Sequence, residues 1–86
     1  MAMTEEQIQD IVFGIIVEQL KIERSTLTRE TTFVKDLNTD SLDTTEMVME
    51  IEDAFQITIP DKEAEKLKTV GETIDWIKKA LEVKEK

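Results

Sequence analysis

The sequence has neither cysteine nor histidine, and these two absences narrow what the protein can do. Without cysteine there is no disulfide framework and no thiolate metal site. Without histidine, a Ser–His or Cys–His catalytic pair and a histidine zinc site are excluded as well. We therefore expect a protein that is not an enzyme and that has no catalytic residues.

Long apolar runs are also absent from the chain. No run approaches the roughly 20 residues that span a bilayer, and residues 1–4 hold no basic n-region of a signal peptide. A chain of 86 residues has room for one small core. We predict a single domain over residues 1–86, ordered from about residue 4 to about residue 82, in a soluble and cytoplasmic protein.

Basic side chains are missing from residues 36–61, although this segment holds eight of the twenty acidic residues. The other 60 residues hold twelve acidic and eleven basic side chains, so nearly all of the net charge of −9 lies in the one segment. Such a negative field argues against nucleic acid or an anionic membrane as a partner. It favours basic protein surfaces.

Helical spacing of apolar residues predicts an all-α fold, a small four-helix bundle of three longer helices and one short one, with a long first loop. The first helix is expected to begin at Thr4, whose capping-box partner is Gln7, and to end near Lys21. A connection over residues 22–39 follows. Its apolar residues are expected to anchor it to the core: Ile22, Leu27, Phe33, Val34 and Leu37.

Pro60 separates the second helix from a short third one, because the residue before a proline avoids the α region. Asp61 is expected to cap this third helix over residues 62–67. Thr69 and Glu72 form another capping box, which predicts the start of the last helix.

The second helix, expected over residues 40–55, is acidic on one side. On a helical wheel, its core face is Met47, Val48, Ile51, Ala54 and Phe55, and its solvent face is a ridge of Asp43, Glu46, Glu50 and Asp53. Leu42 and Met49 lie among these carboxylates, opposite the core. Large apolar side chains in an acidic ridge resemble a docking patch for a protein. The alternative is a solvated charged face with two isolated apolar residues.

Ser41 lies where this helix begins. Asp40 is the better N-cap, which leaves the Ser41 hydroxyl free at the first helical position. That position is at the positive end of the helix dipole, where a phosphate group is favoured. Plain helix capping by an Asp-Ser pair is the alternative.

The same segment is not a calcium loop. Asp36, Asn38 and Asp40 match positions 1, 3 and 5 of the EF-hand pattern, but Ser41 stands at the glycine position and Met47 at the bidentate glutamate position. We expect no metal site.

The residues around Ser41 resemble those of the acyl carrier proteins, most closely the ones of type II fatty acid synthesis. The Asp-Ser-Leu motif at 40–42 lies within DLNTDSLDTTEMVMEIEDAF and is followed by ITIPDKEAEKLKTV, while FVKDL at 33–37 is similar to the end of the family's long first loop. The resemblance covers essentially the whole chain.

The resemblance implies a monomeric carrier, whose motif serine, here Ser41, bears 4′-phosphopantetheine through a phosphodiester. A phosphopantetheinyl transferase adds this arm from coenzyme A, and the arm's thiol holds acyl chains as thioesters for fatty acid synthesis enzymes with basic patches. The implied partner surface is Asp40, Leu42, Asp43, Glu46, Met49, Glu50 and Asp53. The implied acyl pocket is Met47, Ile51, Ile59, Leu67 and Ile74.

Three positions depart from the family pattern. Asn38 replaces a common glycine, and asparagine tolerates the left-handed conformation better than most residues. Thr45 replaces a commonly apolar residue, and Glu50 a commonly small one. The alternatives are a dedicated carrier of polyketide, aminoacyl or lipid-A-type intermediates, and an unmodified acidic helical module that binds basic proteins.

Overall fold

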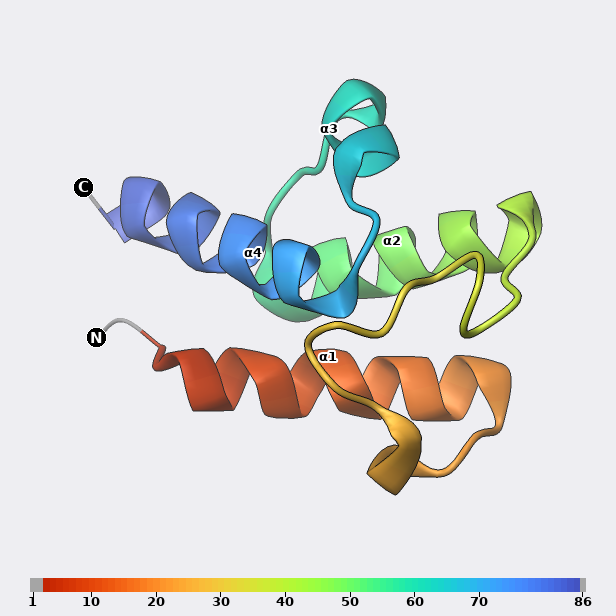
Figure 1. Cartoon of the computed structure of the whole chain (residues 1–86). Helices are drawn as coiled ribbons and strands as arrows, with labels where there is room; N and C mark the ends of the chain where they lie inside the picture. The colour runs from red at the N-terminus through yellow and green to blue at the C-terminus, as the bar shows by residue number, and fades with distance from the viewer. Residues whose placement is uncertain (1–2, 86) are drawn as a thin grey trace.

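The computed structural model describes residues 3–85, so residues 1, 2 and 86 of the expected domain lie outside it. Helices dominate this part of the chain, and no strand is formed in it; the single β-bridge joins Thr32 to Thr69. The expected all-α fold is confirmed (Figure 1). The elements are α1 (Glu5–Leu20), a 3₁₀ turn (Arg24–Thr26), α2 (Ser41–Phe55), α3 (Asp61–Lys66) and α4 (Val70–Glu85).

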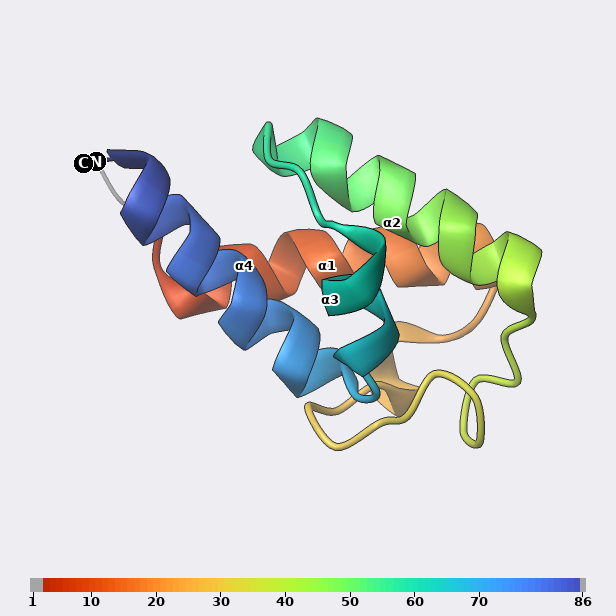
Figure 2. The same ribbon diagram turned by 90° about the horizontal axis from the view of Figure 1, so that it is seen from above.

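The helix α1 forms the floor of the bundle and packs against both α2 and α4. Seen from above, the short α3 lies between α2 and α4, on the side away from α1 (Figure 2). The loop after α1 passes the beginning of α4 before it reaches the beginning of α2 (Figure 2). The beginning of α2, with Asp40 and Ser41, is therefore placed by a long connection and not by a tight turn.

Both expected capping boxes are confirmed. The Gln7 amide donates to Thr4 Oγ1 at 3.1 Å and the Thr4 amide to Gln7 Oε1 at 2.9 Å. Thr69 and Glu72 make the same reciprocal pair before α4, at 3.1 and 2.9 Å. The first helix ends at Leu20, near the predicted position, because Lys21 adopts a left-handed conformation with φ 57°.

The predicted start of α3 was wrong by one residue. Pro60, with φ −61° and ψ 148°, is the N-cap, and Asp61 is the first helical residue. The Pro60 carbonyl accepts the amides of Glu63 and Ala64 at 3.0 and 2.9 Å. The proline ring fixes φ near this value, so the residue that ends the extended connection is also the N-cap of α3.

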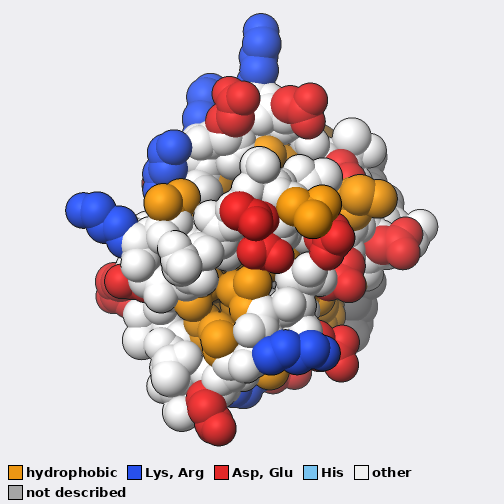
Figure 3. All heavy atoms as spheres, turned by 90° about the vertical axis from the view of Figure 1, so that its right-hand side faces the viewer, with side chains coloured by type: hydrophobic (Ala, Val, Ile, Leu, Met, Phe, Trp, Pro, Cys, Tyr) orange, Lys and Arg blue, Asp and Glu red, His pale blue; other side chains and the backbone are white. Residues whose placement is uncertain are grey.

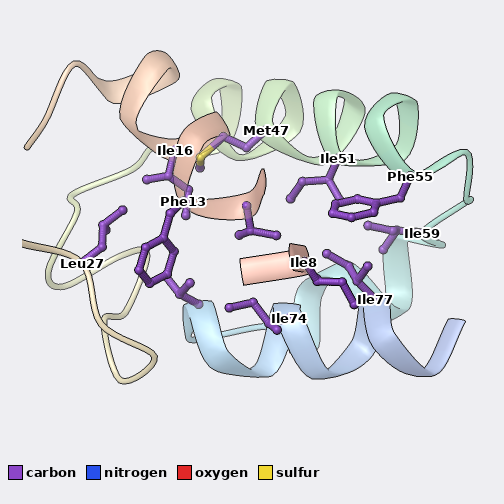
Figure 4. Close-up of a cluster of buried hydrophobic side chains, with 12 residues drawn as sticks. Ile8, Phe13, Ile16, Leu27, Met47, Ile51, Phe55, Ile59, Ile74 and Ile77 are labelled. Atoms are coloured by element: carbon purple, nitrogen blue, oxygen red, sulfur yellow. The ribbon is translucent and has the colours of Figure 1, made fainter. Parts of the chain in front are cut away.

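Twelve buried apolar side chains form one core between α1, α2 and α4, with Leu27 contributed by the loop and Ile59 by the α2–α3 connection (Figure 4). Two predicted core contacts were wrong. Val34 is 71% exposed, because Thr32 and Asp36 close a turn on each other (Thr32 N to Asp36 Oδ2, 2.8 Å) and leave it at the tip. Ala54 is exposed because the apolar face of α2 is narrower than predicted. Its buried residues are Met47, Ile51 and Phe55.

The first loop is bound to α4 by its backbone. Gly71 N donates to Arg29 O at 2.8 Å, and Val70 N to Thr31 O at 3.0 Å. The Arg29 side chain pairs with Asp75 at 2.8 Å and with Glu5 at 3.6 Å. The hydrogen bond to Asp75 is the main cause that raises the pKa of Arg29 above its ordinary value. One arginine thus ties the loop to both α1 and α4.

Candidate attachment and docking site

Asp40 and Ser41 take the expected positions at the beginning of α2, with Asp40 as the N-cap and Ser41 as the first helical residue. Asp40 Oδ1 accepts the amide of Asp43 at 2.8 Å, and the hydroxyl of Thr44 donates to the Asp40 carbonyl at 3.0 Å. Asp40 is therefore the N-cap. Ser41 is exposed at the first helical position, and within residues 3–85 its hydroxyl makes no hydrogen bond.

The backbone before the motif is fixed by two devices. Asn38 has φ 53°, the left-handed conformation for which asparagine is suited. Thr39 then donates both its amide and its hydroxyl to the Phe33 carbonyl, each at 3.0 Å. The chain consequently enters α2 in one direction, with Ser41 facing outward.

A groove of about 690 Å³ begins at Ser41 and runs between α2 and α3. Ser41, Thr45 and Val48 line its α2 side, and Ile59 and Ala64 lie opposite. Thr39 and Thr44 also contribute hydroxyl groups to it, and Val34, which the sequence had assigned to the core, lines it from the loop. The groove gives a flexible arm on Ser41 a path along the protein surface.

Beneath the groove lies an apolar cavity of about 30 Å³, smaller than an acyl chain of several carbons. Four of the residues expected around the cargo line it: Met47, Ile51, Ile59 and Leu67. Ile74 does not line it and is fully buried in the core, while its neighbour Thr73 does. The pocket that the resemblance implied did not include the remaining walls, which come from four different segments: Ile16, Phe33, Thr44, Val48 and Ala64.

The outer face of α2 is acidic with apolar side chains between the carboxylates. Leu42 and Met49 are 64% and 62% exposed. Figure 3 views the molecule from the side where α2 begins, with hydrophobic and acidic side chains side by side on this face. Of the expected partner residues, Asp43 is half-buried and the others are exposed: Asp40, Leu42, Glu46, Met49, Glu50 and Asp53. Glu46 also accepts a hydrogen bond from Gln19 of α1.

A second groove, of about 740 Å³, lies at the end of α2. Its lining contains three carboxylates and no basic residue: Met49, Glu50, Glu52, Asp53, Gln56, Ile57 and Thr58. In the described part of the chain, no group of three or more acidic side chains is arranged to hold a metal ion. None of the helices there has the length and apolar content that crossing a bilayer requires.

Comparisons with known proteins point to one family. The model described as "Phosphopantetheine attachment site" matches residues 10–77. An acyl carrier protein of Lactobacillus johnsonii is 46% identical over 76 residues, which are 88% of this chain and 95% of that protein. One from Chlorobium phaeobacteroides is 46% identical over 77 residues, 90% and 99% of the two chains. The solved acyl carrier protein from Enterococcus faecalis superposes with a TM-score of 0.78 at 38% identity, over 91% of this chain and 99% of that one.

Proposed function

The chain belongs to the acyl carrier proteins and contains their phosphopantetheine attachment domain, and from this premise we propose that Ser41 is the attachment residue. The observation that carries the proposal is the exposed Ser41 hydroxyl, which makes no hydrogen bond within residues 3–85 and lies at the head of a groove. The other serine, Ser25, lies in the 3₁₀ turn (Arg24–Thr26), outside this groove.

The surroundings of Ser41 fit a phosphodiester. The first amides of a helix have no intrahelical acceptor, and the helix dipole favours an anion beside them. Asp40 already binds the Asp43 amide, so the earlier amides of this turn remain for the phosphate. When bound, the group supplies a thiol that holds an acyl chain as a thioester. With no histidine in the chain, the base that takes the Ser41 proton comes from the transferase.

The proposal extends to cargo and pathway. The carrier acts as a cytoplasmic monomer that brings acyl chains to the enzymes of fatty acid synthesis, and it catalyses none of the reactions itself. The relatives are named acyl carrier proteins, which supports an acyl cargo. The apolar cavity beneath the groove supports a place for the chain: Met47, Ile51, Ile59 and Leu67.

The outer face of α2 is the proposed docking surface for the transferase and for basic patches of the synthesis enzymes. It comprises Asp40, Leu42, Asp43, Glu46, Met49, Glu50 and Asp53. Exposed charges of this kind mainly raise the association rate and set orientation. Binding is then fast, weak and sensitive to salt, as a shuttle requires.

Intact-mass measurement tests the attachment. The unmodified chain is incubated with coenzyme A and a broad-specificity phosphopantetheinyl transferase, beside Ser41→Ala and the matched control Ser25→Ala. We expect one phosphopantetheine on the wild type and on Ser25→Ala, and none on Ser41→Ala. Modification of Ser41→Ala, or none of the wild type, would contradict the proposal.

A further inference from the structure

Glu52, in the last turn of α2, accepts hydrogen bonds from the residues after the helix with both its backbone carbonyl and its side chain. Its carbonyl accepts the amides of Gln56 and Ile57, and Gln56 is left-handed with φ 55°. Its carboxylate, Oε2, then accepts the Ile59 amide at 2.7 Å. The connection between α2 and α3 is thus folded around a single acidic residue.

Ile59 is the part of this connection that covers the cargo space. Its side chain is 4% exposed and lies beside Ile51 and Phe55 (Figure 4). It lines both the apolar cavity and the groove that leads to it from Ser41. Thr44 and Val48 of α2 and Ala64 of α3 line both spaces as well, so Ile59 is the shared residue that lies outside a helix. The cavity holds only about 30 Å³, so a wall has to move when an acyl chain enters, and the connection that carries Ile59 is the part not fixed by a helix.

Glu52 also borders both surface grooves. It lines the one that begins at Ser41 and the acidic one at the end of α2. The acidic groove has Glu50 and Asp53 for a cationic head group, and Met49 and Ile57 for the aliphatic stem behind it. A partner's arginine or lysine side chain has the complementary charge and an apolar stem.

Resting on the proposed carrier function, we propose that Glu52 is a positioning residue that holds Ile59 closed over the cargo and couples docking to release. A partner enzyme's cationic side chain enters the acidic groove and competes with the Ile59 amide for the Glu52 carboxylate. Both bonds are charge-assisted, but a guanidinium can bind a carboxylate through both of its oxygens, including the one that accepts the Ile59 amide. The freed Ile59 amide then turns to water, and the Ile59 side chain leaves the mouth of the cavity.

Amide hydrogen exchange of Ile59 in the unmodified chain tests the closed state directly. Glu52→Ala should accelerate it about tenfold, the loss of one hydrogen bond of about 1.4 kcal/mol, with helicity by circular dichroism unchanged. Glu52→Gln keeps an acceptor and should restore slow exchange. Glu50→Ala removes a carboxylate from the same groove but no bond to Ile59, and should exchange like the wild type. Equal exchange in Glu52→Ala and wild type would overturn the proposal.

A tetra-arginine peptide at low salt tests the coupling. We expect it to accelerate Ile59 exchange in the wild type and to have little effect in Glu52→Gln, whose side chain is neutral. In the octanoyl-loaded protein, the peptide or Glu52→Ala should speed cleavage of the thioester by hydroxylamine several-fold. If the peptide binds and changes neither rate, the coupling is wrong.

The two proposals fail in different ways. A chain that cannot be loaded on Ser41 refutes the carrier function, whereas the exchange rates of the unmodified chain still decide whether Glu52 holds Ile59. A chain that loads normally but shows identical cleavage rates in wild type and Glu52→Ala refutes only the role of Glu52.

Discussion

Four acidic residues outside residues 36–61 have a basic partner, whereas within residues 3–85 no acidic residue on the outer face of α2 has one. In the described part of the chain, all five ion pairs lie outside this acidic segment. They are Arg24–Asp10, Arg29–Glu5, Arg29–Asp75, Lys66–Glu63 and Lys78–Glu5. On the α1–loop–α4 side, charge therefore joins segments to one another. On α2 it remains available to another molecule.

Packing also differs between the two regions: it is tight between the first loop and α4 and loose on the outer face of α2. At the beginning of α4, a Cβ on Gly71 would lie 2.9 Å from the Arg29 carbonyl oxygen, so loop and helix are in direct backbone contact. On α2, Leu42 and Met49 are more than half exposed. The first loop and α4 thus form a closed region, packed directly on each other. The outer face of α2 is open, with both charged and apolar side chains exposed to solvent.

The largest effect is expected where the closed region is tightest. Gly71→Ala forces the loop away from α4 and should lower the free energy of unfolding by about 1–3 kcal/mol. The matched control is Gly14→Ala, whose Cβ would have no neighbour within 4 Å and which should stabilise α1 by about 0.5–1 kcal/mol. Urea denaturation measures both. Equal stability of the two variants would show that the close contact between the loop and α4 does not stabilise the fold.

Reversal of one charge on the open face should affect partners and spare the fold. Glu46→Lys should lower kcat/KM of the transferase about tenfold, mainly through association, with helicity unchanged. Glu82→Lys, the same change at an exposed position on α4, is the control and should remain within about twofold of the wild type. If both reversals slow the reaction equally, the loss of rate comes from the change in net charge and not from the outer face of α2.

The unpaired carboxylates also repel one another, so salt should stabilise the protein. Added NaCl or MgCl₂ is expected to raise Tm by a few degrees through screening. The gain should shrink in Glu50→Gln/Asp53→Asn, which removes two charges from the ridge. An unchanged midpoint in thermal melts of the wild type would contradict this view of α2.

The smallest effect concerns Glu63 of α3, which forms an ion pair with Lys66. Its Oε1 accepts the Trp76 indole N–H at 3.1 Å, and this bond, followed by Lys66, holds the pKa of Glu63 below its ordinary value. A lowered pKa means that the stabilisation is present above the unfolded-state pKa and is lost as pH falls through the folded-state pKa. Trp76 is the only tryptophan, so its emission should change in that acidic range. The change should be absent in Glu63→Gln.

Local signals in the sequence were sufficient for much of the fold. The capping boxes at Thr4 and Thr69 involve residues three apart, so the helix starts that they mark were predicted. The capping box of Asp40 with Asp43 was missed, since its second residue is Asp and not the usual Glu or Gln. Ser41 at the first position of α2 also followed from local preference.

Features that depend on distant segments were not predictable from spacing. Val34 has a core-like side chain, but the Thr32–Asp36 turn exposes it. The ion pairs of Arg29 join three separate segments. The bond from Ile59 to Glu52 spans seven residues and depends on a left-handed Gln56 between them. Periodicity describes one element at a time, and these contacts arise between elements.

Two matched double variants test most directly whether paired charges serve the fold and unpaired charges serve recognition. Each removes one Glu and one Asp charge: Glu50→Gln/Asp53→Asn on α2, and Glu5→Gln/Asp75→Asn around Arg29. Transferase kcat/KM and Tm are measured for both at low salt. The account predicts that the α2 variant loses about fivefold in kcat/KM without a lower Tm, and that the Arg29 variant loses Tm with normal kcat/KM. The reverse pattern, or the same pattern in both, would contradict it.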